Sequence, residues 1–151
     1  MDVYATHLQA LVETALATDG PILELGCGDY STPVLSAIAR RQGRVLKIQA
    51  SDVNWLYKFT EFGDIEHVTN WDEWEPPRDV DEWGMVFLDS EQSTLGRIER
   101  LPQLMAVTRV VVLHDAQGAV TRPRWQACTA GWDVEIRKRY NPWTAILRRH
   151  G

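Results

Sequence analysis

The sequence predicts an α/β fold in which a mostly parallel sheet of about seven strands lies between two layers of helices. Three observations carry this prediction. Short apolar runs alternate along the chain with segments of helical periodicity, as in successive β-α-β units. The apolar runs are nearly continuous, which is typical of parallel strands buried on both faces. The last two extended segments flank Asn141-Pro142 and predict an antiparallel pair at the C-terminus.

Each element follows from its local pattern. The predicted strands are 22–25, 44–50, 65–70, 85–89, 109–115, 132–140 and 143–149. The predicted helices are 3–17, 31–41, 52–62, 93–107 and 123–129. Because most of these helices alternate with strands, they are expected to cover both faces of one sheet.

Capping residues predict where the helices begin and end. Gly20 is expected to cap the C-terminus of the first helix. Either Ser31 or Thr32 is expected to be the N-cap of the second helix, and Asp52 the N-cap of the third.

Two segments are expected to depart from regular helix. The stretch 71–83, "WDEWEPPRDVDEW", is acidic, rich in tryptophan and interrupted by two prolines, which predicts an irregular loop. Pro102 predicts a kink or a break in the helix at 93–107, because proline removes a backbone hydrogen bond.

Length and composition predict one domain, 1–151, with an ordinary globular core. No apolar run approaches the roughly 20 residues that a membrane-spanning helix needs. The N-terminal segment carries acidic residues and is amphipathic, unlike a signal peptide. Cys27 and Cys128 have neither a disulfide framework nor metal-site spacing, so the expected location is the reducing cytoplasm.

The charge is unevenly distributed along the chain. The net charge is −5, with 8 basic and 18 acidic residues in 1–100 but 8 basic and 3 acidic residues in 101–151. A general nucleic-acid-binding surface is not expected, because attraction to phosphate dominates that affinity. The basic C-terminal part is either a local basic face or a solvated edge strand.

The stretch "ELGCGDYST" follows the first predicted strand and is the strongest candidate for a ligand site. Gly26 and Gly28 allow a sharp turn and close approach of a ligand, and the next helix begins directly after them. Glu24 is expected to point a carboxylate at the rim of this loop. A dinucleotide fingerprint needs a third glycine where this chain has Ser31, so a simple strand-to-helix turn remains the alternative.

This loop resembles the first motif of class I S-adenosylmethionine-dependent methyltransferases, acid-x-Gly-x-Gly. The resemblance continues in order through "LKIQASDVNWLYKF", "MVFLDS", "LGRIERLPQL" and "VVVLHDA", and thus covers nearly the whole chain. It implies a Rossmann-like sheet with the strand order 3-2-1-4-5-7-6. The small-molecule O-methyltransferases are the most similar branch, because their fourth strand ends in Asp and their fifth often does.

The resemblance also implies how a cofactor is held. Glu24, Gly26 and Gly28 would hold the methionine end of S-adenosylmethionine, with Ser31 nearby.

A second group of residues would hold the nucleoside end of the cofactor. The carboxylate that normally binds the ribose is replaced by Ala50, and Asp52 is the nearest acid. Asp72 is then implied to meet the adenine amino group, with Trp71 stacked on the ring or else only covering the sheet. Asp89 is a further candidate, as a contact for the amino group of the cofactor.

The predicted catalytic residues are Asp89, His114 and Asp115, which follow or end two neighbouring strands. His114 suits a general base, because the ordinary pKa of histidine lies near neutrality, although a core histidine is the alternative. Asp89 and Asp115 could bind magnesium through oxygen. The third ligand of the related metal-dependent enzymes is replaced by Ala116, and Glu91 is the nearest substitute.

Three functions remain open at this stage. The first is methyl transfer from S-adenosylmethionine to a small-molecule acceptor, most simply at oxygen. The second is a degenerate, non-catalytic domain that binds a nucleoside ligand or a protein partner. The third is a nicotinamide-dependent oxidoreductase, against which Ser31 and the terminal strand pair argue. The chain is short for this fold, so the segments 71–83 and 117–124 or a second subunit of a homo-oligomer would have to enclose a substrate.

Overall fold

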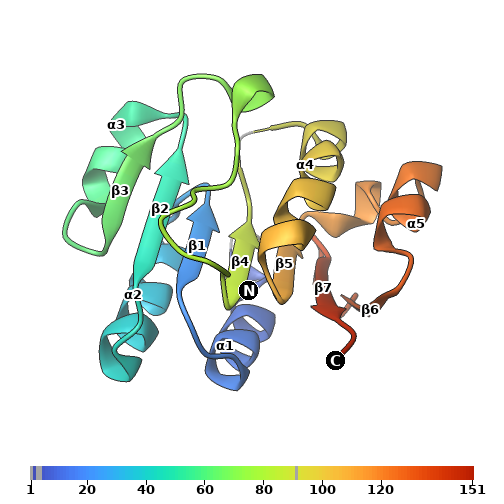
Figure 1. The fold of residues 1–151 in the computed structure, drawn as a ribbon, viewed down its shortest axis with the longest axis horizontal. Helices are drawn as coiled ribbons and strands as arrows, with labels where there is room; N and C mark the ends of the chain where they lie inside the picture. The colour runs from blue at the N-terminus through green and yellow to red at the C-terminus, as the bar shows by residue number, and fades with distance from the viewer. Residues whose placement is uncertain (1, 3–4, 91) are drawn as a thin grey trace.

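The computed structural model describes residues 2, 5–90 and 92–151. It contains one seven-stranded sheet with the order β3-β2-β1-β4-β5-β7-β6, which confirms the predicted fold and strand order (Figure 1). The first five strands are parallel, and β7 is antiparallel to both β5 and β6. The strands are β1 (Ile22–Leu25), β2 (Leu46–Ala50), β3 (Asp64–His67), β4 (Met85–Leu88), β5 (Val110–His114), β6 (Trp132–Arg137) and β7 (Thr144–Arg149).

Helices connect these strands and form a layer on each face of the sheet. The α-helices are α1 (Leu8–Ala17), α2 (Ser31–Gln42), α3 (Val53–Leu56), α4 (Thr94–Val107) and α5 (Pro123–Thr129). Short 3-10 turns in the described part of the chain include η2 (Tyr57–Phe59), η3 (Trp71–Glu73) and η4 (Ala116–Gly118). Between Glu73 and β4 the chain is irregular, as the two prolines predict.

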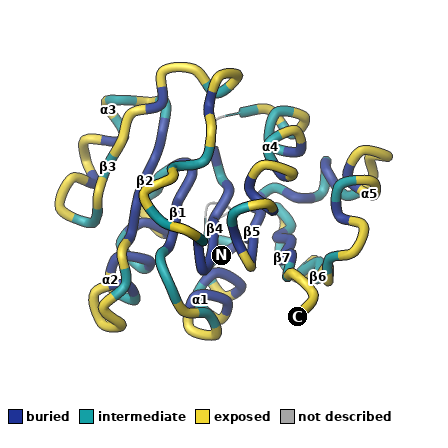
Figure 2. The backbone as a smooth tube through the Cα atoms, in the orientation of Figure 1, coloured by how far each residue is buried: buried dark blue, intermediate teal, exposed yellow. Residues whose placement is uncertain are grey.

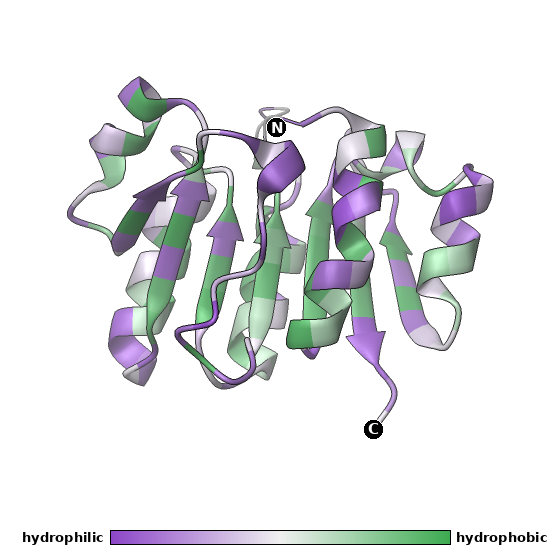
Figure 3. Cartoon of the chain, turned by 45° about the horizontal axis from the view of Figure 1, so that its top comes forward, coloured by the Kyte–Doolittle hydropathy of each residue, from purple (hydrophilic) through white to green (hydrophobic). Residues whose placement is uncertain are grey.

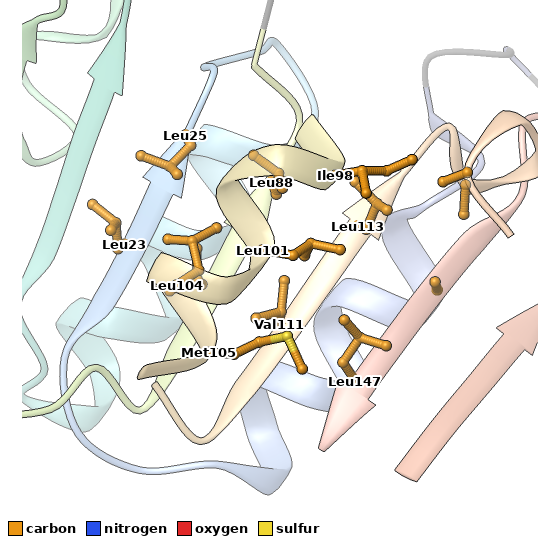
Figure 4. Packing of buried hydrophobic residues seen from close by; sticks show 14 of the residues in the cluster. Leu23, Leu25, Leu88, Ile98, Leu101, Leu104, Met105, Val111, Leu113 and Leu147 are labelled. Carbon is orange, nitrogen blue, oxygen red and sulfur yellow. The ribbon is translucent and has the colours of Figure 1, made fainter. Parts of the chain in front are cut away.

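The helix α4 packs on one face of the sheet through a row of apolar side chains. Ile98, Leu101 and Leu104 are fully buried against strand residues such as Leu23 and Val111, and Figure 4 shows these side chains between the helix and the strands. Trp74 and Trp83 complete the same cluster, so part of the tryptophan-rich loop is core.

The opposite face of the sheet packs on α1 and α2. Leu11 and Leu35 from these helices meet Ile22, Ile48 and Phe87 from the strands. The central strands are therefore buried from both sides, and Figure 2 shows them as the dark centre of the molecule, whereas the outer strands β3 and β6 are largely exposed or half-buried. The nearly continuous apolar runs of the sequence follow from this double burial.

The sequence misplaced some helix boundaries. The first helix begins at Leu8 rather than at position 3, and its C-cap is Thr18 rather than Gly20, which lies in the following turn with φ 77°. Pro102 does not break α4, which continues to Val107. Burial of the apolar residues on both sides of Pro102 offsets the missing backbone hydrogen bond.

Within the described residues, no helix has the length and apolar character that crossing a membrane requires.

Candidate functional site

A pocket of about 420 Å³ lies at the edge of the sheet where the central strands end. In Figure 3 the arrowheads of the parallel strands point to this edge, and β7 points away from it. The glycine loop, residues 26–31, forms one wall through residues 27–31, and Trp55 lies beside it. Asp89 and His114 contribute the ends of β4 and β5, and the N-terminal segment contributes Asp2 and His7.

The two glycines of the loop have different surroundings. Gly26 has φ 86°, and a Cβ there would lie 2.1 Å from the carbonyl oxygen of Asp89. This residue is therefore glycine because the loop passes so close to the end of β4. A Cβ at Gly28 would meet only Ser31 Oγ, at 3.6 Å, so the chain leaves space beside Gly28 on the pocket side.

Glu24 lies beneath the glycine loop rather than at its rim, where the sequence placed it. Its side chain is fully buried, and its Oε1 accepts hydrogen bonds from Ser31 Oγ at 2.5 Å and Thr32 Oγ1 at 3.0 Å. These hydroxyls are therefore not N-caps, and the N-cap position is Tyr30, which makes no side-chain cap. Glu24 Oε2 has no hydrogen-bond partner among the described residues.

The environment of Glu24 favours its protonated form. Burial raises the pKa of Glu24 to about 8, the two hydroxyls oppose the rise, and the charge of Asp89 adds to it. A protonated carboxyl group can still accept both hydroxyl hydrogen bonds through one oxygen. Glu24 thus fixes the loop to the start of α2 and does so without a charge at neutral pH.

Glu24→Gln is expected to remove a pH dependence of stability. The folded pKa of about 8 exceeds the ordinary value of 4.5. The folded state therefore holds the proton more tightly, and the free energy of unfolding falls as the pH rises from about 4.5 to about 8. Glutamine keeps an oxygen for Ser31 and Thr32 but does not titrate. Urea unfolding of both proteins at about pH 5 and about pH 8 measures the difference; an equal decline in both would contradict the raised pKa.

The end of β2 differs from the predicted ribose site. Ala50 is fully buried in the core against α2 and α3, so a carboxylate at this position would also be buried. Asp52 is exposed and is the N-cap of α3, as predicted, with Oδ1 accepting from the backbone N–H of Trp55 at 3.1 Å. Trp55 in turn donates its Nε1–H to the carbonyl oxygen of Cys27 at 2.7 Å. The α3 N-terminus is thereby fixed to the glycine loop.

Trp71 and Asp72 do not line this pocket. Trp71 packs beside the core cluster under α4, with its ring centroid 5.9 Å from that of Trp74. Asp72 is 91% exposed, and its Oδ1 lies 3.9 Å from Arg100 of α4. Both residues therefore follow the α4 face of the sheet, whereas Trp55 is the aromatic residue beside the glycine loop.

Asp89, His114 and Asp115 come together as the adjacent strands predict. One ligand atom from each lies within 4.8 Å of those of the other two. His114 is buried, and its Nδ1 lies 3.2 Å from Asp89 Oδ1, an electrostatic contact that is not aligned as a hydrogen bond. Its Nε2 lies 3.2 Å from Thr6 Oγ1. His114 is thus held from both sides.

Arg97 of α4 occupies the position where a cation would balance the two carboxylates. Its guanidinium lies 3.4 Å from Asp89 Oδ1 and 3.6 Å from Asp115 Oδ2, and the side chain is 12% exposed. It also donates to the backbone oxygens of Ser90, at 2.9 Å from Nε, and His114, at 3.2 Å from Nη1. These hydrogen bonds fix the guanidinium between the acids.

The residues present do not fit a divalent metal ion. Arg97 already supplies positive charge to both carboxylates, and a metal bound by them would lie next to a fixed guanidinium. Ala116, at the position of the usual third ligand, is buried and offers no side-chain oxygen. Glu91, the predicted substitute, lies outside the described residues.

Sequence reasoning missed the N-terminal wall of the pocket. His7 is buried, and its ring centroid lies 4.5 Å from that of His114 and 5.0 Å from that of Phe87. Burial lowers the pKa of His7 to about 4, and the neighbouring His114 adds to this effect, while Asp89 opposes it. The sequence could have indicated that His7 is buried, because it lies four residues before Leu11 and therefore on the same buried side as that residue of α1.

Tyr30 connects the glycine loop to the N-terminal segment. Its hydroxyl group donates a hydrogen bond to Asp2 Oδ2 at 2.7 Å. The N-terminal segment and the start of α2 therefore meet at the pocket. The N-terminal segment thus covers one side of the pocket, whereas the sequence analysis expected the segments 71–83 and 117–124 or a second subunit to enclose a substrate.

No protein-family model matches the sequence, and no curated protein is similar to it. Solved structures with the same fold include the 23S rRNA methyltransferase ErmE, at 16% identity and TM-score 0.58, covering 95% of this chain and 68% of that one. The S-adenosylhomocysteine-bound methyltransferase PaMTH1 of Podospora anserina matches at 14% identity and TM-score 0.63, covering 99% of this chain and 81% of that one.

A third structure of this kind is a TehB-like S-adenosylmethionine-dependent methyltransferase from Corynebacterium glutamicum. It is 11% identical with TM-score 0.60, and the match covers 97% of this chain and 94% of that one. At such low identity the likeness establishes the fold. Together with the strand order and the terminal antiparallel strand, it shows that this chain has the fold of the class I S-adenosylmethionine-dependent methyltransferases.

Proposed function

We propose that this protein transfers a methyl group from S-adenosylmethionine to an oxygen atom of a small molecule. The observation that carries the proposal is the pocket between the glycine loop and the ends of β4 and β5. Ligands of open parallel sheets bind at this edge. The proteins of known structure that share the fold include several described as methyltransferases, one of them with S-adenosylhomocysteine bound.

The loop suits the methionine end of the cofactor. Gly28 leaves space for a ligand on the pocket side, and Ser31 lines the same wall. Glu24 and Gly26 position this loop from below, through the Ser31 and Thr32 hydroxyls and through the close approach to Asp89. Asp89, which is partly exposed in the pocket, is the proposed contact for the amino group.

The nucleoside end is assigned by chain position. Asp52, on the helix that is fixed to the glycine loop through Trp55, is the proposed ribose contact. Trp71 and Asp72 stay predicted adenine contacts, and they require the adenine to extend past the pocket toward the α4 face.

The side chains at the strand ends suit a proton transfer. S-adenosylmethionine supplies a methyl group activated by a positively charged sulfur. A hydroxyl group is a weak nucleophile until it loses its proton, and His114 is the proposed general base through Nε2, where the acceptor hydroxyl would take the place of Thr6 Oγ1. Asp89 Oδ1 lies 3.2 Å from His114 Nδ1, where its charge stabilises the protonated imidazole. Arg97 and Asp115 hold Asp89 and the end of β5 in place, so we propose a reaction without magnesium.

Calorimetric titration of the full chain with S-adenosylmethionine, S-adenosylhomocysteine and NAD tests the function. We expect both adenosyl ligands to bind at micromolar concentrations and NAD not to bind. Binding of NAD alone would favour an oxidoreductase. Binding of none of the three would favour the non-catalytic alternative, for which the missing acid at position 50 is the main argument.

Two substitutions at Asp52 separate ribose binding from helix capping. Asp52→Asn keeps an oxygen for the Trp55 N–H but loses the charge, whereas Asp52→Ala loses both. If the carboxylate binds the ribose, both changes should weaken S-adenosylhomocysteine binding by about tenfold or more, because a hydrogen bond to a charged group contributes roughly 1.5–3 kcal/mol. Only the alanine variant should also lose about 1 kcal/mol of stability, with the cap.

Wild-type affinity for S-adenosylhomocysteine in Asp52→Asn would show that the charge of Asp52 does not bind the ribose. Thermal unfolding of the three proteins without ligand provides the control for the cap.

A further inference from the structure

His7 presents unused hydrogen-bonding capacity at the pocket. The side chain is 3% exposed, and neither ring nitrogen has a hydrogen-bond partner among the described residues. A neutral imidazole carries one donor and one acceptor, and buried groups of this kind are nearly always paired. His114, by contrast, has Asp89 beside one nitrogen and Thr6 beside the other. Of the two neighbouring rings, His7 is therefore the one with both nitrogens free, within the described chain, for a bound molecule.

The position of His7 is well defined. It directly precedes α1, and its ring lies between the rings of Phe87 and His114. It lines the same pocket as the glycine loop but on the wall beside the end of β5. A ligand atom at this wall lies next to the proposed base and apart from the Trp55 wall.

The charge of the pocket restricts what can bind there. Three carboxylates line it, from Asp2, Asp29 and Asp89, and none of its described lining residues is lysine or arginine. The nearest guanidinium, Arg97, is already fixed by Asp89, Asp115 and two backbone oxygens. A pocket lined by one sign of charge repels ligands of that sign.

From these contacts we propose that His7 and His114 form the acceptor subsite, and that it takes a small molecule with an uncharged hydroxyl group and no anionic group. The inference rests on the proposed function and adds to it the substrate class. His7 is a binding and positioning residue here: it hydrogen-bonds the acceptor hydroxyl and orients it beside His114. The three aspartates disfavour acceptors with a net negative charge, such as carboxylated and phosphorylated molecules and nucleic acids, whereas the carboxylate of S-adenosylmethionine is balanced by its own ammonium and sulfonium groups.

The test uses the full chain saturated with S-adenosylhomocysteine and two aromatic probes of similar size, phenol and benzoate. Calorimetric titration is expected to show phenol binding at millimolar concentrations and benzoate binding at least about tenfold more weakly. His7→Phe should weaken phenol binding by about tenfold or more, and His7→Gln, which keeps a donor and an acceptor, should restore part of it. His150→Gln, an exposed histidine outside this pocket, is the control.

Stability distinguishes this role from a purely structural one. Phenylalanine keeps an aromatic ring against Phe87 and removes two unpartnered nitrogens, so the melting temperature of His7→Phe should not fall. A lowered melting temperature with unchanged phenol affinity would overturn the proposal.

Two further outcomes separate this inference from the function on which it rests. If wild-type protein binds S-adenosylhomocysteine but not phenol, or binds benzoate as tightly as phenol, the acceptor subsite is wrong and the methyltransferase proposal stands. If it binds no adenosyl ligand, both are wrong.

Discussion

Replacing Gly28 by valine is expected to abolish binding of S-adenosylhomocysteine while the protein stays folded. A Cβ at Gly28 meets only Ser31 Oγ, at 3.6 Å, so the folded chain tolerates a branched side chain. The two methyl groups would occupy the pocket wall that the ligand needs. We expect binding to weaken by at least about 100-fold, or ~2.8 kcal/mol, in calorimetric titration.

Gly26→Ala is the matched control for this loop. Its single Cβ would lie 2.1 Å from the Asp89 carbonyl oxygen, at a residue with φ 86°. Backbone strain and overpacking each contribute about 1–3 kcal/mol, so this smaller change should lower the free energy of unfolding by roughly 2–6 kcal/mol. Equal ligand affinity in wild type and Gly28→Val would show that the cofactor site lies elsewhere.

The strands could be predicted because their signals are local, and their order was implied by the resemblance to the class I methyltransferases. The central strands are largely apolar runs that are buried from both sides, and the end of β5 lies beside the end of β4 because these strands are parallel neighbours. The proximity of Asp89, His114 and Asp115 follows from that adjacency alone. Asp52 was also predictable as a cap, because its hydrogen bond reaches only three residues ahead.

The wrong predictions concern residues whose partners are distant or compete with local ones. Ser31 and Thr32 are good N-caps by type, but a buried acid, Glu24, takes both hydroxyl groups. The adenine contact predicted for Trp71 is untested, but its packing beside the cluster under α4 also depends on a distant partner, because α4 begins more than twenty residues later. No local pattern reports which face of the sheet such a loop follows.

His7 and Arg97 show a second limit of sequence reasoning. The ring of His7 contacts that of His114, which lies 107 positions away in the chain. Only the packing of α1 on the sheet brings the two rings together. Arg97 reads as one more polar residue on an amphipathic helix. Its contact with two strand ends depends on where α4 crosses β4 and β5, which periodicity does not determine.

Arg97→Met is expected to destabilise the protein and to create a weak metal site. Among the described residues, the change removes the only arginine or lysine within 4 Å of Asp89 and Asp115. Breaking a buried ion pair costs about 3–5 kcal/mol, and since both carboxylates are partly exposed we expect about 2–3 kcal/mol. Urea unfolding measures this loss.

Arg100→Met is the matched control on the same helix. Arg100 is equally buried at 12% exposure, but its partner Asp72 is 91% exposed, and the ion-pair distance is 3.9 Å. Its Nε is also buried without a partner among the described residues. We expect the control to change stability by less than about 1 kcal/mol. A similar loss in both variants would mean that Arg97 acts through packing of its aliphatic chain rather than through charge.

Magnesium then tests whether Asp89 and Asp115 bind a metal ion or are paired with Arg97 alone. In the wild type the Arg97 guanidinium lies beside both carboxylates, so millimolar magnesium should leave the melting temperature unchanged. In Arg97→Met, Asp89, His114 and Asp115 offer ligand atoms within 4.8 Å of one another and no guanidinium between them. Magnesium at ten times its dissociation constant would stabilise this variant by about 1.4 kcal/mol, and Asp115→Asn in the same background should abolish the effect. A magnesium-dependent shift in the wild type, removed by Asp115→Asn, would instead show that the guanidinium and a metal ion share the site, and a metal-assisted reaction would replace the metal-independent one.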